Sequence, residues 1–83
     1  MPPEIALQYV DDCDFSGIKT IGVEAFRVVN GALQPLLDEI GDWSSAEQSD
    51  VRTINAETRA FINRFNHQAD IRISISISDT RAR

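Results

Sequence analysis

The side chains with the clearest potential for chemistry lie in an acidic stretch, residues 11–17, which reads Asp-Asp-Cys-Asp-Phe-Ser-Gly. Oxygen-bearing side chains recur within it at alternate positions, Asp12, Asp14 and Ser16. Oxygen ligands are the ones that Ca²⁺ and Mg²⁺ prefer, and the glycine that follows permits a sharp turn. Asp12, Asp14 and Ser16 are therefore candidate metal ligands for Ca²⁺, although the leading expectation for the chain is that it has no cofactor.

The order Asp-x-Asp-x-Ser-Gly over residues 12–17 resembles the opening of an EF-hand-type calcium loop. The resemblance implies a calcium-binding protein, and it covers these six residues before the pattern departs. Lys19 stands where the family has an apolar residue, and Val23 stands where it has a bidentate glutamate. The competing interpretation is a turn whose aspartate side chains cap the helix that follows.

The residues for nucleophilic catalysis are sparse. Cys13 lies between Asp12 and Asp14, whose negative charges should raise the pKa of its thiol and so disfavour the reactive thiolate. His67 is the single histidine, at the expected end of a helix, where its charged form suits the helix dipole. With one cysteine, one histidine and no motif that pairs a base with a nucleophile, we expect no enzyme and name no catalytic residue.

Charge divides the chain into two unequal halves. Residues 1–51 hold ten acidic and two basic residues, a balance of −8, whereas residues 52–83 hold three acidic residues and six arginines, a balance of +3. The acidic half includes Asp38, Glu39 and Asp42, next to the single tryptophan, Trp43. This pattern predicts an acidic face that binds a basic protein, with Trp43 as an aromatic anchor. It disfavours nucleic acid, whose phosphates require a basic stripe.

Length and composition predict one small domain over residues 1–83, with a frayed tail at about 79–83. A hydrophobic content of 42% is typical of a globular protein. No apolar run approaches the length of a membrane span, and the start of the chain lacks the basic residues of a signal peptide. A single cysteine excludes an internal disulfide framework, so we expect a cytoplasmic protein.

Two elements are strongly patterned. Val51, Ile54, Thr58, Phe61, Ile62 and Phe65 form one apolar stripe of a helix. We expect this helix to begin at a capping box made by Ser44 and Glu47. After it, isoleucine alternates with polar residues from Ile71 to Ile77, which is typical of a strand with one apolar face.

The remaining elements complete a β-α-α-α-β order. Alternation over residues 4–10 predicts a first strand. Apolar residues at helical spacing predict two helices, at about 20–30 and 33–41, with Asn30-Gly31 and Pro35 as interruptions. The predicted fold is a small α+β domain whose sheet packs on the long amphipathic helix.

Two strands make a marginal sheet, so this order raises the question of what completes it. Either a third strand lies around residues 18–23, whose sequence is ambiguous between strand and helix, or another chain supplies the missing strand. An open sheet edge can be covered by a second copy or lent to a target protein. We expect a homodimer.

The segment from Ala60 to Ile73 is similar to the final helix and strand of barstar-type nuclease inhibitors, and residues 33–40 look like their acidic inhibitory helix. The resemblance implies that Asp38, Glu39 and Asp42 would plug a basic active site. The family has a further strand between its acidic and final helices, for which this chain has no room.

The sequence therefore favours a non-catalytic protein-binding module, a small acidic inhibitor or regulator of a basic partner protein. A calcium- or magnesium-binding protein and a self-assembling structural subunit are the alternatives.

Overall fold

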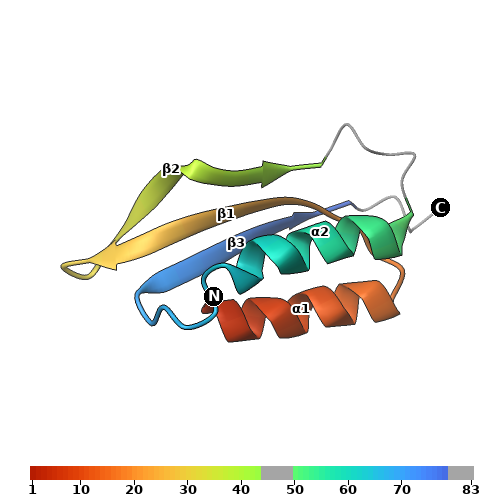
Figure 1. Cartoon of the computed structure of the whole chain (residues 1–83), viewed down its shortest axis with the longest axis horizontal. Helices are drawn as coiled ribbons and strands as arrows, with labels where there is room; N and C mark the ends of the chain where they lie inside the picture. The colour runs from red at the N-terminus through yellow and green to blue at the C-terminus, as the bar shows by residue number, and fades with distance from the viewer. Residues whose placement is uncertain (44–49, 79–83) are drawn as a thin grey trace.

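The computed structural model describes residues 1–43 and 50–78. The order along the chain is α1 (Pro3–Phe15), β1 (Thr20–Val29), β2 (Ala32–Asp42), α2 (Val51–Asn63) and β3 (Ile71–Ile77). The strands are antiparallel and ordered β2-β1-β3, and both helices lie along one face of the sheet (Figure 1). The expected α+β class is confirmed, whereas the expected β-α-α-α-β order is wrong. Neither α1 nor α2 has the length and apolarity needed to cross a membrane.

The first element is a helix, although we expected a strand at residues 4–10. Its buried side chains include Ala6, Val10 and Cys13, which are spaced four and three residues apart and so share one helical face. Ile5, which contributes to the apparent alternation, is exposed. The alternation over residues 4–10 is therefore a weaker signal than the helical spacing of the buried residues, which extends past residue 10 to Cys13.

The acidic stretch is the last turn of α1 and its C-cap. Gly17 adopts a positive φ of 74°, and its N–H donates to the Asp14 carbonyl at 3.2 Å. The next N–H, that of Ile18, donates to the Cys13 carbonyl at 2.8 Å. This is the Schellman arrangement, in which a left-handed glycine satisfies the final carbonyls of a helix. The glycine that suggested a calcium loop therefore ends a helix in this structure.

The segment that we expected to form two helices, 20–30 and 33–41, is a β-hairpin. Asn30 and Gly31 have φ values of 51° and 79°, the left-handed conformation that two-residue hairpin turns require. Asn-Gly is the preferred pair for such a turn because these residues tolerate positive φ better than others. The residues that seemed to interrupt a helix are the turn itself. The acidic inhibitory helix implied by the barstar resemblance is therefore strand β2.

The isoleucine strand is confirmed as β3. Residues 18–23, whose sequence was ambiguous between strand and helix, include the start of β1, which is the third strand of the sheet. The described residues of one chain form a three-stranded sheet with β1 in its centre. On the outer edge of β3, the Ile73 N–H donates to the Met1 carbonyl at 2.6 Å, and the Met1 amine donates to the Ile73 carbonyl at 2.9 Å. The homodimer is not required to complete the sheet and stays a prediction.

The amphipathic helix is confirmed as α2. Its N-cap is Asp50, whose side chain accepts from the Thr53 N–H at 2.8 Å. The capping box expected from Ser44 and Glu47 and the tail at 79–83 lie outside the described residues. The apolar face of α2 joins α1 and the sheet in a single core, made by Ala6, Val10, Val23, Ala25, Phe61, Ile62, Phe65, Ile71 and Ile73.

A buried polar junction connects α2 to β1 and to the end of α1. The Asn55 Oδ1 accepts from the Thr20 N–H at 2.9 Å and from the Thr20 hydroxyl at 2.8 Å. The Asn55 Nδ2 donates to the Ile18 carbonyl at 3.0 Å and to the Asp14 carboxylate at 3.3 Å. The Thr58 hydroxyl lies 2.7 Å from that of Thr20. Asn55, Thr20 and Thr58 are fully buried, so these bonds determine how the elements meet.

We predict that Asn55→Leu lowers the free energy of unfolding by about 2–4 kcal/mol. Leucine is similar in size to asparagine but has no oxygen, so the buried Thr20 N–H would lose its acceptor. Urea denaturation measures this change. Asn63→Leu, on the exposed side of the same helix, is the matched control and should cost less than about 0.5 kcal/mol. Equal losses in the two variants would contradict the role of the junction.

A second prediction concerns pH. The hydrogen bond from Thr53 lowers the pKa of Asp50 below its ordinary value of 3.8. A depressed carboxyl pKa stabilises the folded state above the unfolded-state pKa, and this contribution is lost as the pH falls through the folded-state value. The thermal midpoint of the wild type should therefore exceed that of Asp50→Ala at neutral pH, and the difference should shrink as the pH falls below 3.8. A difference that stays constant across this range would contradict the assignment.

Candidate functional site

The most prominent surface of the described residues is the face of the sheet opposite the helices. Val23 and Ala25 of β1 are buried toward the helices, so Glu24 and Phe26, between and after them, point to the other face. Residues directly opposite in an antiparallel pair share a face. The open face accordingly carries these side chains on the three strands: Gly22, Glu24, Phe26 and Val28; Arg72, Ser74 and Ser76; Leu33, Pro35, Ile40 and Asp42.

Strand β2 gives this face its apolar margin. Leu33 and Ile40 on this face expose 60% and 52% of their surface, and Leu37, which lies between Pro35 and Ile40 where the register with β1 shifts, exposes 78%. β2 is also an edge strand, and within residues 1–43 and 50–78 no segment pairs with its outer side (Figure 1). Exposed, apolar edge strands are ready templates for pairing with another chain.

The acidic residues expected to bind a partner all lie at the same strand, but they are not equivalent. Asp38 and Asp42 are exposed. Glu39 is partly buried and accepts from the Arg64 guanidinium at 2.5 Å, which joins β2 to the end of α2. Arg64 also lies over the rings of Phe61 and Phe65. Glu39 therefore has a partner within its own chain, whereas its neighbour Asp38 is exposed to solvent.

Trp43 lies at the end of β2, where it packs against the core as a half-buried residue. Its backbone N–H donates to the Ile21 carbonyl at 2.9 Å. Its ring covers Gly41 so closely that a Cβ at Gly41 would lie 2.3 Å from the ring carbon Cη2. Trp43 therefore has a structural role in closing the core beside β2, and its use as an aromatic anchor for a partner stays a prediction.

The candidate metal ligands lie at the junction of the two helices. Asp14 accepts from Arg59 at 3.2 Å as well as from Asn55, and Asp11 accepts from Arg59 at 2.9 Å. The hydrogen bond that Arg59 donates to Asp11 is the main reason that the pKa of Arg59 is raised. Among the described residues, no three histidine, cysteine or acidic side chains gather where they could hold a metal ion. Through Asp11 and Asp14 the acidic stretch fastens α1 to α2, and metal binding by Asp12, Asp14 and Ser16 stays a prediction.

The cysteine follows the expectation from its neighbours. Burial is the main reason that the pKa of the Cys13 thiol is raised; a hydrogen bond with Tyr9 opposes this effect, and the charge of Asp12 adds to it. The residue is 4% exposed, because its side chain faces the core of the helix layer. A thiol with a raised pKa and little exposure is a poor nucleophile.

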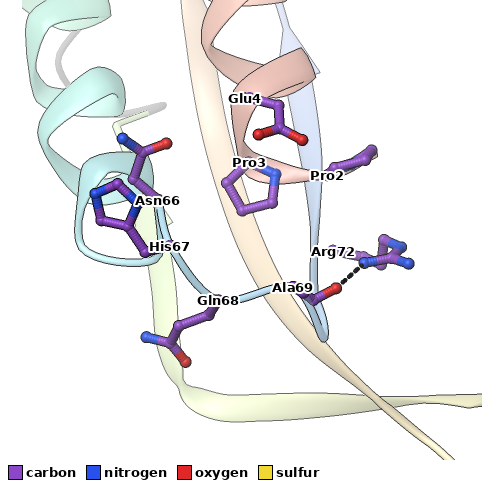
Figure 2. A pocket seen from close by; sticks show the side chains of 8 residues that line it. All are labelled: Pro2, Pro3, Glu4, Asn66, His67, Gln68, Ala69 and Arg72. Carbon is purple, nitrogen blue, oxygen red and sulfur yellow. Dashed lines mark hydrogen bonds between the residues drawn. The ribbon is translucent and has the colours of Figure 1, made fainter.

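A hollow of about 370 Å³ is formed by the start of α1, residues 66–69 and Arg72 of β3 (Figure 2). It contains His67 and Glu4, but no serine, threonine or cysteine lines it. The Arg72 guanidinium donates to the carbonyls of Ala69 and Ile71 at 2.9 and 2.8 Å. Arg72 therefore holds the loop before β3 in place, and no nucleophile stands beside the histidine.

Two further hollows flank β2. One, of about 590 Å³, lies where β2 passes the end of α2 and is lined by Leu36, Leu37 and Phe65 together with polar and charged residues. The other, of about 270 Å³, lies over Gly22 and is bordered by Glu24, Ile40, Asp42 and Ser76. Both hollows and the open face of the sheet thus include residues of β2.

Comparisons with protein families, with curated proteins and with solved structures gave no match for this chain. Function must therefore be argued from the surface itself. The acidic residues lie on one segment, β2, and the helix predicted for residues 33–41 did not indicate the exposure of its leucines and Ile40. The Asn30-Gly31 pair was the signal that could have identified the edge strand.

We predict that Gly41→Ala displaces the Trp43 ring from the core, because the new Cβ would also lie 2.9 Å from the Val23 side chain. The emission of the single tryptophan should then move to longer wavelength, as the ring becomes exposed to water. Gly22→Ala is the control, since its Cβ would meet Ser76 at an ordinary 3.5 Å. Identical spectra for the two variants would show that Trp43 does not depend on this glycine.

Proposed function

We propose that this chain is a non-catalytic protein-binding module, a small acidic inhibitor or regulator that binds a basic partner protein through β2 and the open face of the sheet. The observation that carries the proposal is β2 itself. It is an edge strand on which three large apolar side chains are exposed beside acidic ones. Apolar side chains supply binding energy at the centre of an interface, and charges around them select the partner.

The charge of the surface supports a basic partner. From Ala32 to Asp42 the strand carries three acidic residues and no basic one, and Glu24 adds a carboxylate on the neighbouring strand. A basic protein would be attracted over a distance of about 10 Å at moderate salt, which accelerates encounter. A second copy paired through β2 would instead bring two sets of carboxylates together, and like charges directly opposite are destabilising.

The chemistry of the described residues supports a binding function over a catalytic one. Cys13 is buried with a raised pKa, and the hollow that holds His67 offers no nucleophile. The acidic side chains around Asp14 are engaged by Arg59 and Asn55. The exposed surface of β2 is what remains for function, and its residue types suit protein recognition.

The test is a charge reversal on β2. After a partner has been captured from the native host, Asp38→Lys combined with Asp42→Lys should slow its association by about tenfold or more at low salt, because the steering field is reversed. The effect should diminish as salt is added. Association kinetics on a sensor surface measure both dependences.

The matched control is Glu4→Lys combined with Glu57→Lys, which changes the net charge equally but alters exposed positions on the helix layer. This pair should slow association much less than the β2 pair. If both pairs slow association equally, net charge alone governs binding and β2 is not the interface. Association unchanged by the β2 pair would also overturn the proposal.

A further inference from the structure

We infer that the partner contributes an extended segment of alternating basic and apolar residues, which adds as a fourth strand along the outer edge of β2. This inference rests on the proposed function and specifies its mode of recognition. In strand addition, main-chain hydrogen bonds give affinity, and pockets for alternate side chains give specificity. Three features of β2 support this mode: backbone groups that point away from β1, hollows on both sides of the strand, and acidic side chains.

The backbone of β2 faces outward at Ile40. The Trp43 N–H donates to β1 at the Ile21 carbonyl, and in an antiparallel ladder the residues that face one neighbour alternate along the strand. Gly41, two residues before Trp43 and opposite Val23, therefore faces β1, whereas the N–H and carbonyl of Ile40 point away from it. Pro35 lacks an N–H, which suits it to an edge strand and limits pairing to the other residues.

The surroundings of β2 suit alternate side chains of an added strand. On the helix side, the hollow of about 590 Å³ beside Leu36 and Phe65 can receive apolar side chains. On the open face, a basic side chain placed next to Ile40 would lie within reach of Asp42, since diagonal neighbours across strands are about 7–8 Å apart. An added segment could thus place its apolar side chains on the helix side of β2, next to the hollow, and its basic side chains on the open face, next to Asp42.

The outer edge of β3 is a poorer receptor. Met1 already occupies it at Ile73 through two backbone hydrogen bonds. The side chains of β3 on the open face are the half-buried Arg72 and the exposed Ser74 and Ser76, so a basic segment would find no carboxylate on that strand. Charge and access therefore both favour β2.

The test uses a short end-capped peptide of alternating lysine and valine as the probe, with the intact wild-type protein. The peptide should bind and slow hydrogen exchange at the Ile40 amide, measured by NMR. A peptide of alternating glutamate and valine should bind at least about tenfold more weakly, because its charges repel those of β2. A pair of lysine–valine peptides, N-methylated at one or the other set of alternate positions, should differ by about tenfold in affinity, since only one set faces β2.

A protein variant gives an independent readout. Ile40→Pro removes the outward N–H and should weaken binding of the lysine–valine peptide by about tenfold. Ile40→Thr, which shortens the apolar side chain but keeps the N–H, should weaken it much less. Circular dichroism establishes whether the proline variant keeps its fold, and the N-methylated peptides test the same point in the unaltered protein.

The outcomes separate the inference from the function on which it rests. If charge reversal on β2 abolishes partner binding but the two N-methylated peptides bind equally, strand addition is overturned and the protein-binding function stands. If neither the peptide nor the partner responds to β2 substitutions, both are overturned. If sedimentation shows a dimer in which the Ile40 amide is already protected, a second copy occupies the edge and the inference is wrong.

Discussion

A single buried amide, that of Asn55, joins the three parts of the structure that must meet. Its oxygen accepts from the backbone and hydroxyl of Thr20, and its nitrogen donates to Ile18 and Asp14. A buried polar group without partners would cost more than the net gain of any one of these bonds, so the arrangement is satisfied only when α2, the start of β1 and the end of α1 are in register. The position of β1 under α2 follows from this constraint, and the places of β2 and β3 follow from β1.

Once β1 is central and both helices cover one face, the small size of the chain determines the rest. The two helices bury the face that contains Val23, Ala25, Ile71 and Ile73, and the described residues leave the other face open. Small domains bury a smaller share of their surface than large ones do. The open face and β2 are the surfaces that this small domain does not cover, and the acidic side chains beside exposed leucines there are the basis on which we propose a basic partner.

The sequence was most informative where one pattern ran without competition. The stripe on α2 and the alternation of β3 were both predicted, because each repeats over several turns or residues. The prediction failed where two periods overlapped: Ile5 and its neighbours imitate a strand, while Ala6, Val10 and Cys13 form the buried face of α1. The hairpin differs from the prediction for another reason: Asn30-Gly31 interrupts the helical spacing of residues 20–41, but the same pair also forms a turn that selects strands on both sides.

For the candidate site, the sequence by itself determined which residue types occur together: acidic residues, leucines, an isoleucine and a tryptophan within residues 33–43. It contains no motif that pairs a nucleophile with a base. Only the tertiary structure decided which of these residues are accessible. Glu39 is held by Arg64 and Trp43 covers Gly41 within the core, whereas Asp38 and Ile40 are exposed. The physical reason is that charge and apolarity belong to each residue alone, while exposure depends on pairing with segments distant in sequence. The acidic turn at residues 11–17 shows the same limit, because Arg59 and Asn55 of α2 supply the partners of its aspartates.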